Sequence, residues 1–444
     1  MSRRSFVTHV LLIVFSVIQF SQDSWGQSSF FRKKGATGLS GTVIEAQDGS
    51  YRFTGMVHSD ESPSYELFLM KLNRVGKVQW KKRFAAARVT LYNPTIVQSK
   101  DGNFILAASA QGGTLDSDIL IIRIDKNGAV LSQKLIDSGL HEMVSAIANT
   151  ADGGAVVTGT LYSGVQGEIF GTFVIQMDRH GKIQWSRMYR DTERGIGIAQ
   201  TSDGGYVVAN RFFDENDLSI QMNLKKLKSQ GRTVWSKIIS GRLNTITGSV
   251  AVSSKGDLVM AGTVADEGTD GFLIAFNSTG TLLWKKKYRF SDETGARTFN
   301  SSMSNVAATA DGGLIAGGYA SLSDGYQSFI MKLNAKGNII WKKVFDAIHG
   351  DEDVVLQPTQ DGGAVSTFKE LTDDVASEEI SVLKLDGSGN SPACVAEFPI
   401  QLKHSKIDLS IQNGTKNSAT LPVSISNFSM KVSNWSNAFP NACS

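Results

Sequence analysis

The segment KLNAKGNIIWKKVF, residues 332–345, decides the fold, because the chain repeats it. Two short stretches with alternating apolar residues flank the turn NAKG, which predicts a pair of strands joined by a tight turn. Related segments begin at Lys71, Gln176, Leu227 and Phe276. This recurrence indicates an internal repeat rather than a single hairpin.

A second motif, Asp-Gly before a short apolar stretch, gives the repeat its period. Its first glycines are separated by 53, 51, 51, 52, 56 and 50 residues, and a second glycine follows each after 24 to 28 residues. Glycine accepts the positive φ of such a turn, and the Asp side chain can bond the backbone ahead. A calcium site at these aspartates is the alternative, but no D-x-D-x-D cluster accompanies them. The first anchors are Gly49, Gly102, Gly153, Gly204, Gly256, Gly312 and Gly362, and the second are Gly76, Gly128, Gly181, Gly231, Gly280, Gly337 and Gly389.

Each copy contains four short stretches of strand character. Four-stranded units of about 40–50 residues, repeated four to eight times, are typical of β-propellers. The sequence therefore predicts an all-β chain, a seven-bladed β-propeller of four-stranded blades over residues 38–393. The expected blades lie near 40–90, 91–140, 141–192, 193–243, 244–300, 301–348 and 349–393. The seventh copy lacks the last of its four stretches, so its fourth strand must come from the residues that follow or from elsewhere.

An aromatic residue recurs four positions after the second glycine in five copies. We expect each Trp to pack between neighbouring blades and to donate its N–H to a carbonyl group. A basic residue follows two positions later, and on an outer edge strand its charge would prevent pairing with another chain. The tryptophans are Trp80, Trp185, Trp235, Trp284 and Trp341, and the basic residues are Lys82, Lys134, Arg187, Lys237, Lys286 and Lys343.

Both ends of the chain differ from the repeat. Residues 1–26 combine Arg3 and Arg4 with the apolar run Val10–Phe20, which predicts a secretory signal peptide cut before Gln27, by the general or the twin-arginine route. That run is too short for a comfortable membrane span. We expect an exported protein in the periplasm, at the cell surface or outside the cell.

The C-terminal tail, residues 394–444, contains the only two cysteines of the chain. In an exported protein, Cys394 and Cys443 predict a disulfide. We expect the tail to pack on or close the propeller as a staple on the last blade, and a sorting or attachment tail is the alternative.

The repeat pattern D-G-G-Y-x-x-x-G…K-L-D-x-x-G-x-x-x-W-x-K-x-Y resembles that of secreted bacterial propeller-repeat proteins, most of which have no assigned activity. The resemblance covers roughly residues 38–393 and implies a fold and an exported location, but no catalytic residue. The Trp turn is distantly similar to repeats of quinoprotein-type propellers, although this chain lacks their Thr-Gly pair and vicinal cysteines.

Function on a repeat scaffold usually lies where the loops vary. Both glycine turns should fall on one rim of the ring, which leaves the longer, variable connections on the other. No Ser-His-Asp set, metal-spaced His pair or phosphate loop is present, so we predict no catalytic residue, metal or cofactor. The candidate binding residues on the variable rim are His141, Glu142, Arg190, Arg194, His349, Asp351 and Glu352.

These observations favour a monomeric binding or interaction scaffold whose ligand is a protein, a glycan or a small molecule. The formal net charge of +3 and the absence of a basic run argue against nucleic-acid binding. The alternatives are an enzyme of the quinoprotein, glycosidase or lyase kind with a site at the channel mouth, and a structural component of an envelope assembly.

Overall fold

The computed structural model describes residues 30–434, except 35–37, 59–63, 113–115, 164–167, 191–192, 216–217, 245–247, 266–267, 292–299, 323–324, 346–353, 372–377, 391–400, 415, 417 and 428–429. Every regular element in this part of the chain is a strand, and it contains no helix long and apolar enough to cross a membrane. The cysteines Cys394 and Cys443 and the candidates His349, Asp351 and Glu352 lie outside the described residues.

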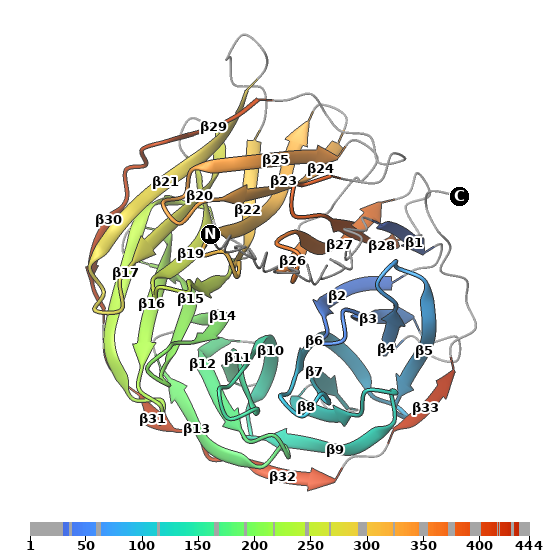
Figure 1. Ribbon diagram of the computed structural model, residues 1–444. Helices are drawn as coiled ribbons and strands as arrows, with labels where there is room; N and C mark the ends of the chain where they lie inside the picture. Colours follow the sequence, from blue (N-terminus) through green and yellow to red (C-terminus); the bar gives the residue numbers. More distant parts are fainter. Residues whose placement is uncertain are drawn as a thin grey trace, which may run out of the picture.

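Consecutive strands pair antiparallel in meanders that surround a central axis (Figure 1). The innermost strands are β2 (Gly38–Glu45), β6 (Thr90–Gln98), β10 (His141–Asn149), β14 (Arg194–Gln200), β18 (Val250–Val252), β22 (Asn300–Ala308) and β26 (Val355–Pro358). The second strands are β3 (Tyr51–His58), β7 (Phe104–Gln111), β11 (Ala155–Ser163), β15 (Tyr206–Asp214), β19 (Leu258–Ala265), β23 (Leu314–Leu322) and β27 (Ala364–Leu371). The third are β4 (Tyr65–Leu72), β8 (Ser117–Ile124), β12 (Glu168–Met177), β16 (Ser219–Leu227), β20 (Thr269–Phe276), β24 (Gly325–Leu333) and β28 (Glu378–Leu385). The outer strands are β5 (Val78–Ala85), β9 (Val130–Asp137), β13 (Ile183–Tyr189), β17 (Thr233–Leu243), β21 (Leu282–Ser291), β25 (Ile339–Phe345) and β1 (Phe30–Lys34).

This radial arrangement of antiparallel sheets is a β-propeller. The hydrogen-bonded ladders form six sheets, because the Leu243↔Val264 pair joins two meanders into a ten-stranded sheet. The apolar core lies in layers between successive sheets; one layer, with Phe84, Leu106 and Leu120, joins the β2–β5 and β6–β9 meanders.

The two kinds of glycine turn lie at the same end of the sheets, as the sequence predicted. The Asp-Gly turn joins the innermost strand of a meander to its second strand. The turn at the other repeated glycine joins the third strand to the outer strand. Antiparallel pairing therefore places both turns on one rim, here called the turn rim. The opposite rim, here called the loop rim, carries the connections between second and third strands and between successive meanders.

Each Asp-Gly turn is held by its own carboxylate. Asp311 accepts hydrogen bonds from the hydroxyl of Thr309 and from the N–H of Gly313, at 3.1 Å from the Gly313 nitrogen. Its other oxygen lies 2.7 Å from the Nζ of Lys332, on the third strand of the same meander. These bonds, that to Lys332 first, lower the pKa of Asp311 to about 2. The same carboxylate-to-Lys contact recurs in the pairs Asp203–Lys226 and Asp361–Lys384.

The repeated tryptophans connect neighbouring meanders. The indole N–H of Trp235 donates to the Ser278 carbonyl at 3.0 Å, and that of Trp284 donates to the Ala335 carbonyl at 3.2 Å. Each of these carbonyls belongs to the outer turn of the next meander. The glycine of the turn below Trp284 is Gly337. A Cβ atom at Gly337 would lie only 2.9 Å from the Trp284 ring, so the packing of the indole requires a glycine there.

The ring is closed by the N-terminal strand. β1 pairs antiparallel with β28 from Phe30↔Lys384 to Lys34↔Ile380 and becomes the outer strand of the β26–β28 meander. The fourth strand missing from the last sequence repeat therefore comes from residues that precede the first repeat. Pairing of the first strand with the last sheet fixes both ends of the propeller in one ladder.

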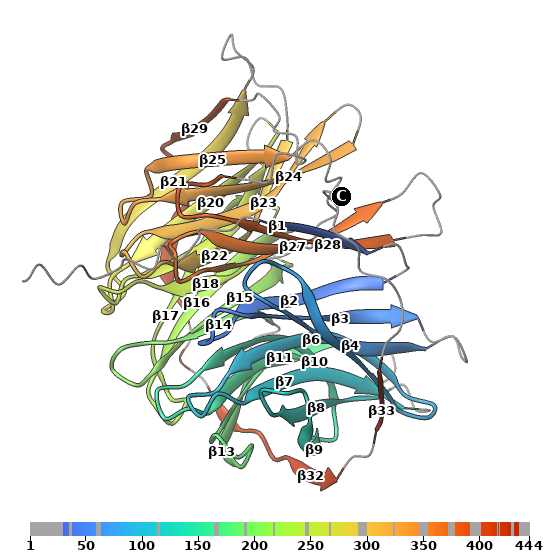
Figure 2. The ribbon, with the colours of Figure 1, turned by 45° about the vertical axis from the view of Figure 1, so that its right-hand side comes forward.

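The C-terminal tail forms a belt around the outside of the ring. Its five strands run back along the meanders and pair antiparallel with β21, β17, β13, β9 and β5, in that order. Figures 1 and 2 show this belt in red and brown on the outer surface. The belt strands are β29 (Gln401–Ser405), β30 (Ser410–Asn413), β31 (Ala419–Thr420), β32 (Ser424–Asn427) and β33 (Lys431–Asn434).

The belt bears on two predictions. In its described residues the tail packs on five meanders other than the last, so the expected staple on the last blade is not found there, and both cysteines lie outside the described residues. Five outer strands pair with a belt strand of the same chain and are therefore not free edges, and protection against pairing with another chain stays a prediction. Two of the basic side chains bond the belt: Lys237 Nζ donates to the Asn413 amide oxygen at 2.8 Å, and Arg187 donates to the Thr420 hydroxyl at 2.9 Å.

Candidate functional site

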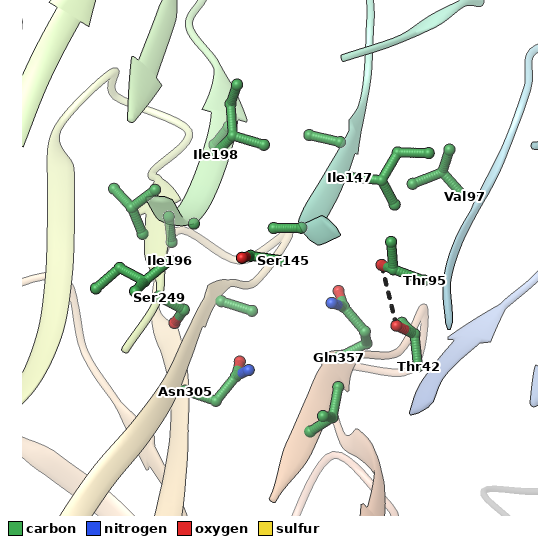
Figure 3. A pocket seen from close by; sticks show the side chains of 18 of the residues that line it. Thr42, Thr95, Val97, Ser145, Ile147, Ile196, Ile198, Ser249, Asn305 and Gln357 are labelled. Atoms are coloured by element: carbon green, nitrogen blue, oxygen red, sulfur yellow. Dashed lines mark hydrogen bonds between the residues drawn. The ribbon is translucent and has the colours of Figure 1, made fainter. Parts of the chain in front are cut away.

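The innermost strands line a central cavity of about 840 Å³ (Figure 3). Its middle presents hydroxyl and amide side chains, including Thr42, Ser145, Ser249 and Asn305, between aliphatic ones such as Ile196 and Ile198. Cavities of this volume accept small molecules or the end of an oligosaccharide rather than a folded protein domain.

Repeated β-bulges shape the wall of this cavity. The pairing register shifts between Ser40 and Val43 in β2, between Val144 and Ala146 in β10, and between Met303 and Asn305 in β22. β6 and β14 have similar shifts. A bulge adds one residue on one strand and re-aims its neighbours. Several polar side chains are consequently directed at the axis, although the strands pack apolar faces between sheets.

Charge in the cavity wall is unevenly distributed. Its only charged lining residues in the described chain are Arg194, Arg211 and Glu45. The Glu45 carboxylate, near the turn rim, already accepts the N–H of Gln360 at 2.6 Å. The two arginines lie at the loop rim and pair directly across β14 and β15. The loop-rim end of the cavity, here called the mouth, is therefore positively charged.

The guanidinium of Arg194 lies on an aromatic ring rather than on a carboxylate. It stands 5.7 Å from the centre of the Tyr162 ring, and it forms no ion pair with any described residue. Both side chains are half-buried and line the cavity. Arginine on an aromatic face keeps its in-plane N–H donors available for a carboxylate, sulfate or phosphate group.

His141 extends this group on the other side of Tyr162. The two rings meet edge to face, with their centres 5.4 Å apart. The backbone N–H of Ser117 donates to His141 Nδ1 at 3.2 Å, so in the neutral imidazole the proton is on Nε2. His141, Tyr162 and Arg194 thus form a continuous row at the mouth, from the start of β10 to the start of β14.

Two further exposed side chains lie on the loop rim. The Arg190 guanidinium lies 5.0 Å from the centre of the Phe170 ring. Phe213, on the same face of β15 as Arg211, leaves 53% of its surface exposed. An exposed ring beside arginines offers a stacking surface for the apolar face of a sugar or for a planar group.

Glu142 follows His141 in sequence but faces another way. Its side chain is fully buried, and its Oε1 accepts the backbone N–H of Ser138 at 3.1 Å. Burial raises the pKa of Glu142 to about 8 despite these hydrogen bonds. No described residue gives its Oε2 a hydrogen bond. Glu142 is consequently separate from the Arg194 row.

The structure brings together only part of the candidate set. His141 and Arg194 meet through Tyr162. Arg190 follows the outer strand β13 and lies on Phe170, and Glu142 points away. Sequence analysis missed Tyr162, Arg211 and Phe213. A signal for Arg211 was present, because only one other repeat has a basic residue at the equivalent strand position. That position holds Met56, Ser109, Thr160, Thr263, Tyr319 and Lys369 in the other repeats.

Comparisons with known proteins place the chain in no family. No family model matches it, and no curated protein matches it. Among solved structures, it is similar to a protein of unknown function from Dyadobacter fermentans, with 12% identity, a TM-score of 0.46, and coverage of 80% of this chain and 97% of that one.

Two other solved structures show similarity of the same order. The polysaccharide lyase Uly1 is 9% identical, with a TM-score of 0.48 and coverage of 81% of this chain and 100% of that one. The β-propeller domain of the Trilobed protease from Pyrococcus furiosus is 9% identical, with a TM-score of 0.44 and coverage of 81% and 98%.

Proposed function

We propose that this chain is an exported, seven-bladed β-propeller that binds an acidic glycan at the mouth of its central cavity. The observation that carries the proposal is Arg194, which stacks on Tyr162, has no ion pair within the described chain and faces Arg211 across the sheet. Seven innermost strands and seven pairs of glycine turns support the blade count.

The chemistry of the mouth selects for charge and for a flat apolar surface. A guanidinium offers a planar fork of donors that matches a carboxylate or a sulfate. The exposed ring of Phe213 can stack on the face of a sugar, and the hydroxyl groups of Thr160 and Ser145 lie deeper in the cavity. The cavity volume limits the bound part to a few sugar units.

Binding of polyuronate and sulfated oligosaccharides, measured by calorimetry against neutral glycans of equal length, tests this proposal. We expect Arg194→Gln to weaken binding of the acidic glycan by about 10- to 100-fold, since a charge-assisted hydrogen bond contributes roughly 1.5–3 kcal/mol. Arg232→Gln, which removes an exposed arginine on the turn rim, is the matched control and should leave the affinity unchanged. Equal binding of acidic and neutral glycans would overturn the proposal.

An enzyme that cleaves such a glycan by elimination is the second candidate. The row of His141, Tyr162 and Arg194 places two proton-transfer groups beside a cation. In a uronate, one group would remove the proton next to the carboxylate, Arg194 would stabilise the negative charge that develops there, and the other would protonate the leaving oxygen. Formation of an unsaturated sugar, followed by ultraviolet absorbance and lost in Tyr162→Phe, would establish this activity.

Export belongs to the same proposal. A signal peptide over residues 1–26 and a Cys394–Cys443 disulfide predict a secreted product that starts at Gln27 and contains no reactive thiol. Intact-mass analysis of the protein recovered from the periplasm or medium, with and without a thiol reagent, checks both features. Recovery of an uncleaved chain from the cytoplasm would contradict export.

A further inference from the structure

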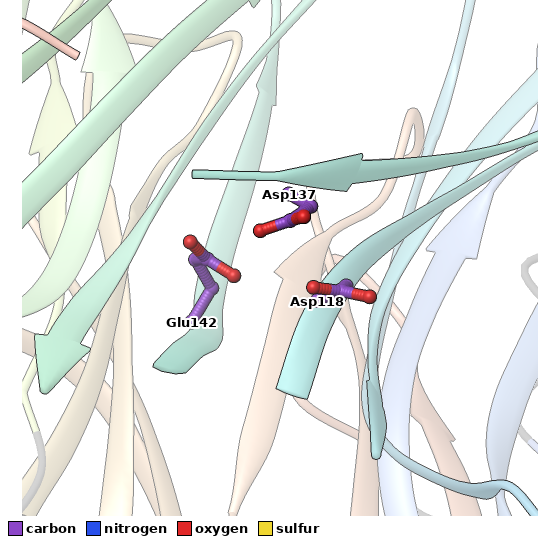
Figure 4. A group of neighbouring side chains, drawn as sticks. All are labelled: Asp118, Asp137 and Glu142. Atoms are coloured by element: carbon purple, nitrogen blue, oxygen red, sulfur yellow. The ribbon is translucent and has the colours of Figure 1, made fainter. Parts of the chain in front are cut away.

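Three carboxylates converge on the loop rim, at the junction between the β6–β9 and β10–β13 meanders (Figure 4). Asp118 belongs to β8, Asp137 ends β9 and Glu142 lies near the start of β10. One oxygen of each carboxylate lies within 4.8 Å of the others. None of the three forms an ion pair with a Lys, Arg or His of the described chain.

Glu142 gives independent evidence that something else belongs at this position. Its side chain is fully buried, and its Oε2 has no hydrogen-bond partner in the part of the chain that the structure describes. Figure 4 shows the Glu142 carboxylate directed at Asp118 and Asp137. A buried carboxylate oxygen without a partner costs free energy, and a neighbouring carboxylate adds repulsion instead of relieving it.

A bound cation would remove both costs. We propose that Asp118, Asp137 and Glu142 form a calcium site beside the mouth of the cavity. Calcium takes six to eight oxygen ligands at about 2.3–2.6 Å, so oxygens on opposite sides of the ion are about 4.6–5.2 Å apart. The oxygens of the cluster fit inside that span. The site does not depend on the proposed glycan ligand.

The surroundings provide the remaining requirements. Asp137 is at least partly exposed, so an ion can enter from solvent and keep water ligands on that side. The hydroxyl of Ser138 already donates to Glu142 Oε1 and lies close to the cluster. Calcium fits better than magnesium, because magnesium needs near-ideal octahedral geometry at about 2.0–2.1 Å and gives up its waters reluctantly.

The position of the cluster gives the ion a structural role. Its ligands come from two successive meanders, so binding would tie their loop-rim ends together. Glu142 directly follows His141, whose Nδ1 is bonded by the N–H of Ser117 next to Asp118. A calcium ion would therefore order the strand ends that hold His141 beside Tyr162.

The test uses the full chain, stripped of metal with a chelator, and measures its melting temperature with Ca²⁺, with Mg²⁺ and with the chelator alone. We expect saturating Ca²⁺ to raise Tm by roughly 2–5 °C, and Mg²⁺ to have a smaller effect. Terbium luminescence is the second measurement, because the Tyr92 hydroxyl is hydrogen-bonded to the side chain of Ser117, which itself donates to the Glu142 carbonyl at 2.7 Å. No change in Tm with Ca²⁺ and no terbium signal would overturn the proposal, and an equal response to Mg²⁺ would overturn the assignment to calcium.

Variants distinguish a calcium site from an acid cluster that only shares protons. Glu142→Gln should abolish the Ca²⁺-dependent rise yet leave Tm in chelator equal to or above that of the unmodified chain, since the neutral amide needs no counter-ion in the buried site. Asp118→Asn should also abolish the Ca²⁺-dependent rise in Tm, and it replaces Glu142→Gln in the test if that variant folds poorly. Glu168→Gln, an exposed acid on the same rim, is the matched control. A Ca²⁺ response that survives in both variants, or a Glu142→Gln loss of Tm that is equal with and without Ca²⁺, would count against the site.

Discussion

Carboxylates on the two rims of this propeller have opposite environments. On the turn rim, Asp311 has a Lys, a Thr hydroxyl and a backbone N–H around it, and its pKa falls to about 2. On the loop rim, burial, Asp137 and Asp116 raise the pKa of Asp118 to about 6, and burial raises that of Glu142 to about 8. Asp311 therefore has the partners that an acid needs to stabilise the fold, whereas the cluster of Asp118, Asp137 and Glu142 leaves charge for a ligand to compensate.

Two repeats show how the difference arises. Glu142 and Glu193 occupy the same repeat position, ten residues before Asp152 and Asp203 respectively. Glu193 Oε2 lies 2.5 Å from the Nζ of Lys225, and both side chains are buried. The position in β12 that corresponds to Lys225 is Ile175, which is also buried. The same acid is therefore a candidate cation ligand in one meander and part of a structural ion pair in the next.

The largest expected effect comes from breaking the structural pair. Lys225→Met leaves the Glu193 charge buried without its base and should lower the free energy of unfolding by about 3–5 kcal/mol. Adding Glu193→Gln should recover about 1–3 kcal/mol of that loss, because no charge then remains. Denaturant unfolding measures both changes. A Lys225→Met loss below about 1 kcal/mol would mean that Glu193 has another source of compensation.

A matched pair of glycines separates backbone strain from packing on the turn rim. Gly231 and Gly204 have nearly the same φ, 75° and 76°. A Cβ on Gly231 would lie 2.6 Å from the Trp185 ring, whereas a Cβ on Gly204 would meet nothing within 4 Å. We expect Gly231→Ala to cost about 2–4 kcal/mol and Gly204→Ala about 1 kcal/mol in thermal or chemical unfolding. Equal losses would show that the Trp packing contributes little.

Acid titration tests the turn rim directly. The folded pKa of Asp311, about 2, lies below its ordinary value of 3.8, so the pair with Lys332 stabilises the fold above pH 3.8 and is lost as the pH falls through about 2. Because half of the Asp311 side chain is exposed, we expect less than about 1 kcal/mol. Asp311→Asn should therefore be less stable than the unmodified chain at pH 6 and equally stable near pH 2. A difference that does not change with pH would indicate loss of the turn hydrogen bonds alone.

The smallest effect is expected from building a pair that one repeat lacks. The fifth repeat has Lys255 in place of the turn Asp, and Ala275 in place of the basic partner. We expect Lys255→Asp and Ala275→Lys together to show a favourable coupling of about 0.2–1 kcal/mol in a double-mutant cycle, although Ala275→Lys alone should destabilise its buried position. Zero coupling would limit the Asp–Lys contact to a role in turn geometry.

Residues with a local role could be predicted from the sequence. The period of Gly49 to Gly362 indicated the propeller, and the shared position of Trp235 and Trp284 indicated packing between neighbouring units. The Asp–Lys contact was missed, although the joint loss of Asp and Lys in the fifth repeat was a readable sign of it. Contacts between residues far apart in sequence could not be predicted, because β1 and the belt strands are too short to carry a distinctive pattern.

The residues of the mouth also separate into those that the sequence could predict and those that it could not. His141, Arg190 and Arg194 could be chosen because they are charged or titratable residues next to variable loops. Tyr162 and Phe213 could not, since an aromatic residue at the end of a strand reads as core until its exposure is known. Asp118 and Asp137 lie in different strands from Glu142, so only the packing of two successive sheets shows that their side chains meet.

The course of the belt has a consequence for the order of folding. β33, the last described strand along the belt, pairs with β5 of the first meander, so the outer edge of that meander stays open until the chain has been made as far as Asn434. An open edge can pair with another chain and aggregate. The basic residues of the outer strands, such as Lys82 and Lys134, do not exclude the belt in the finished protein. We expect them to matter earlier, as temporary protection of edges that the chain itself will later cover.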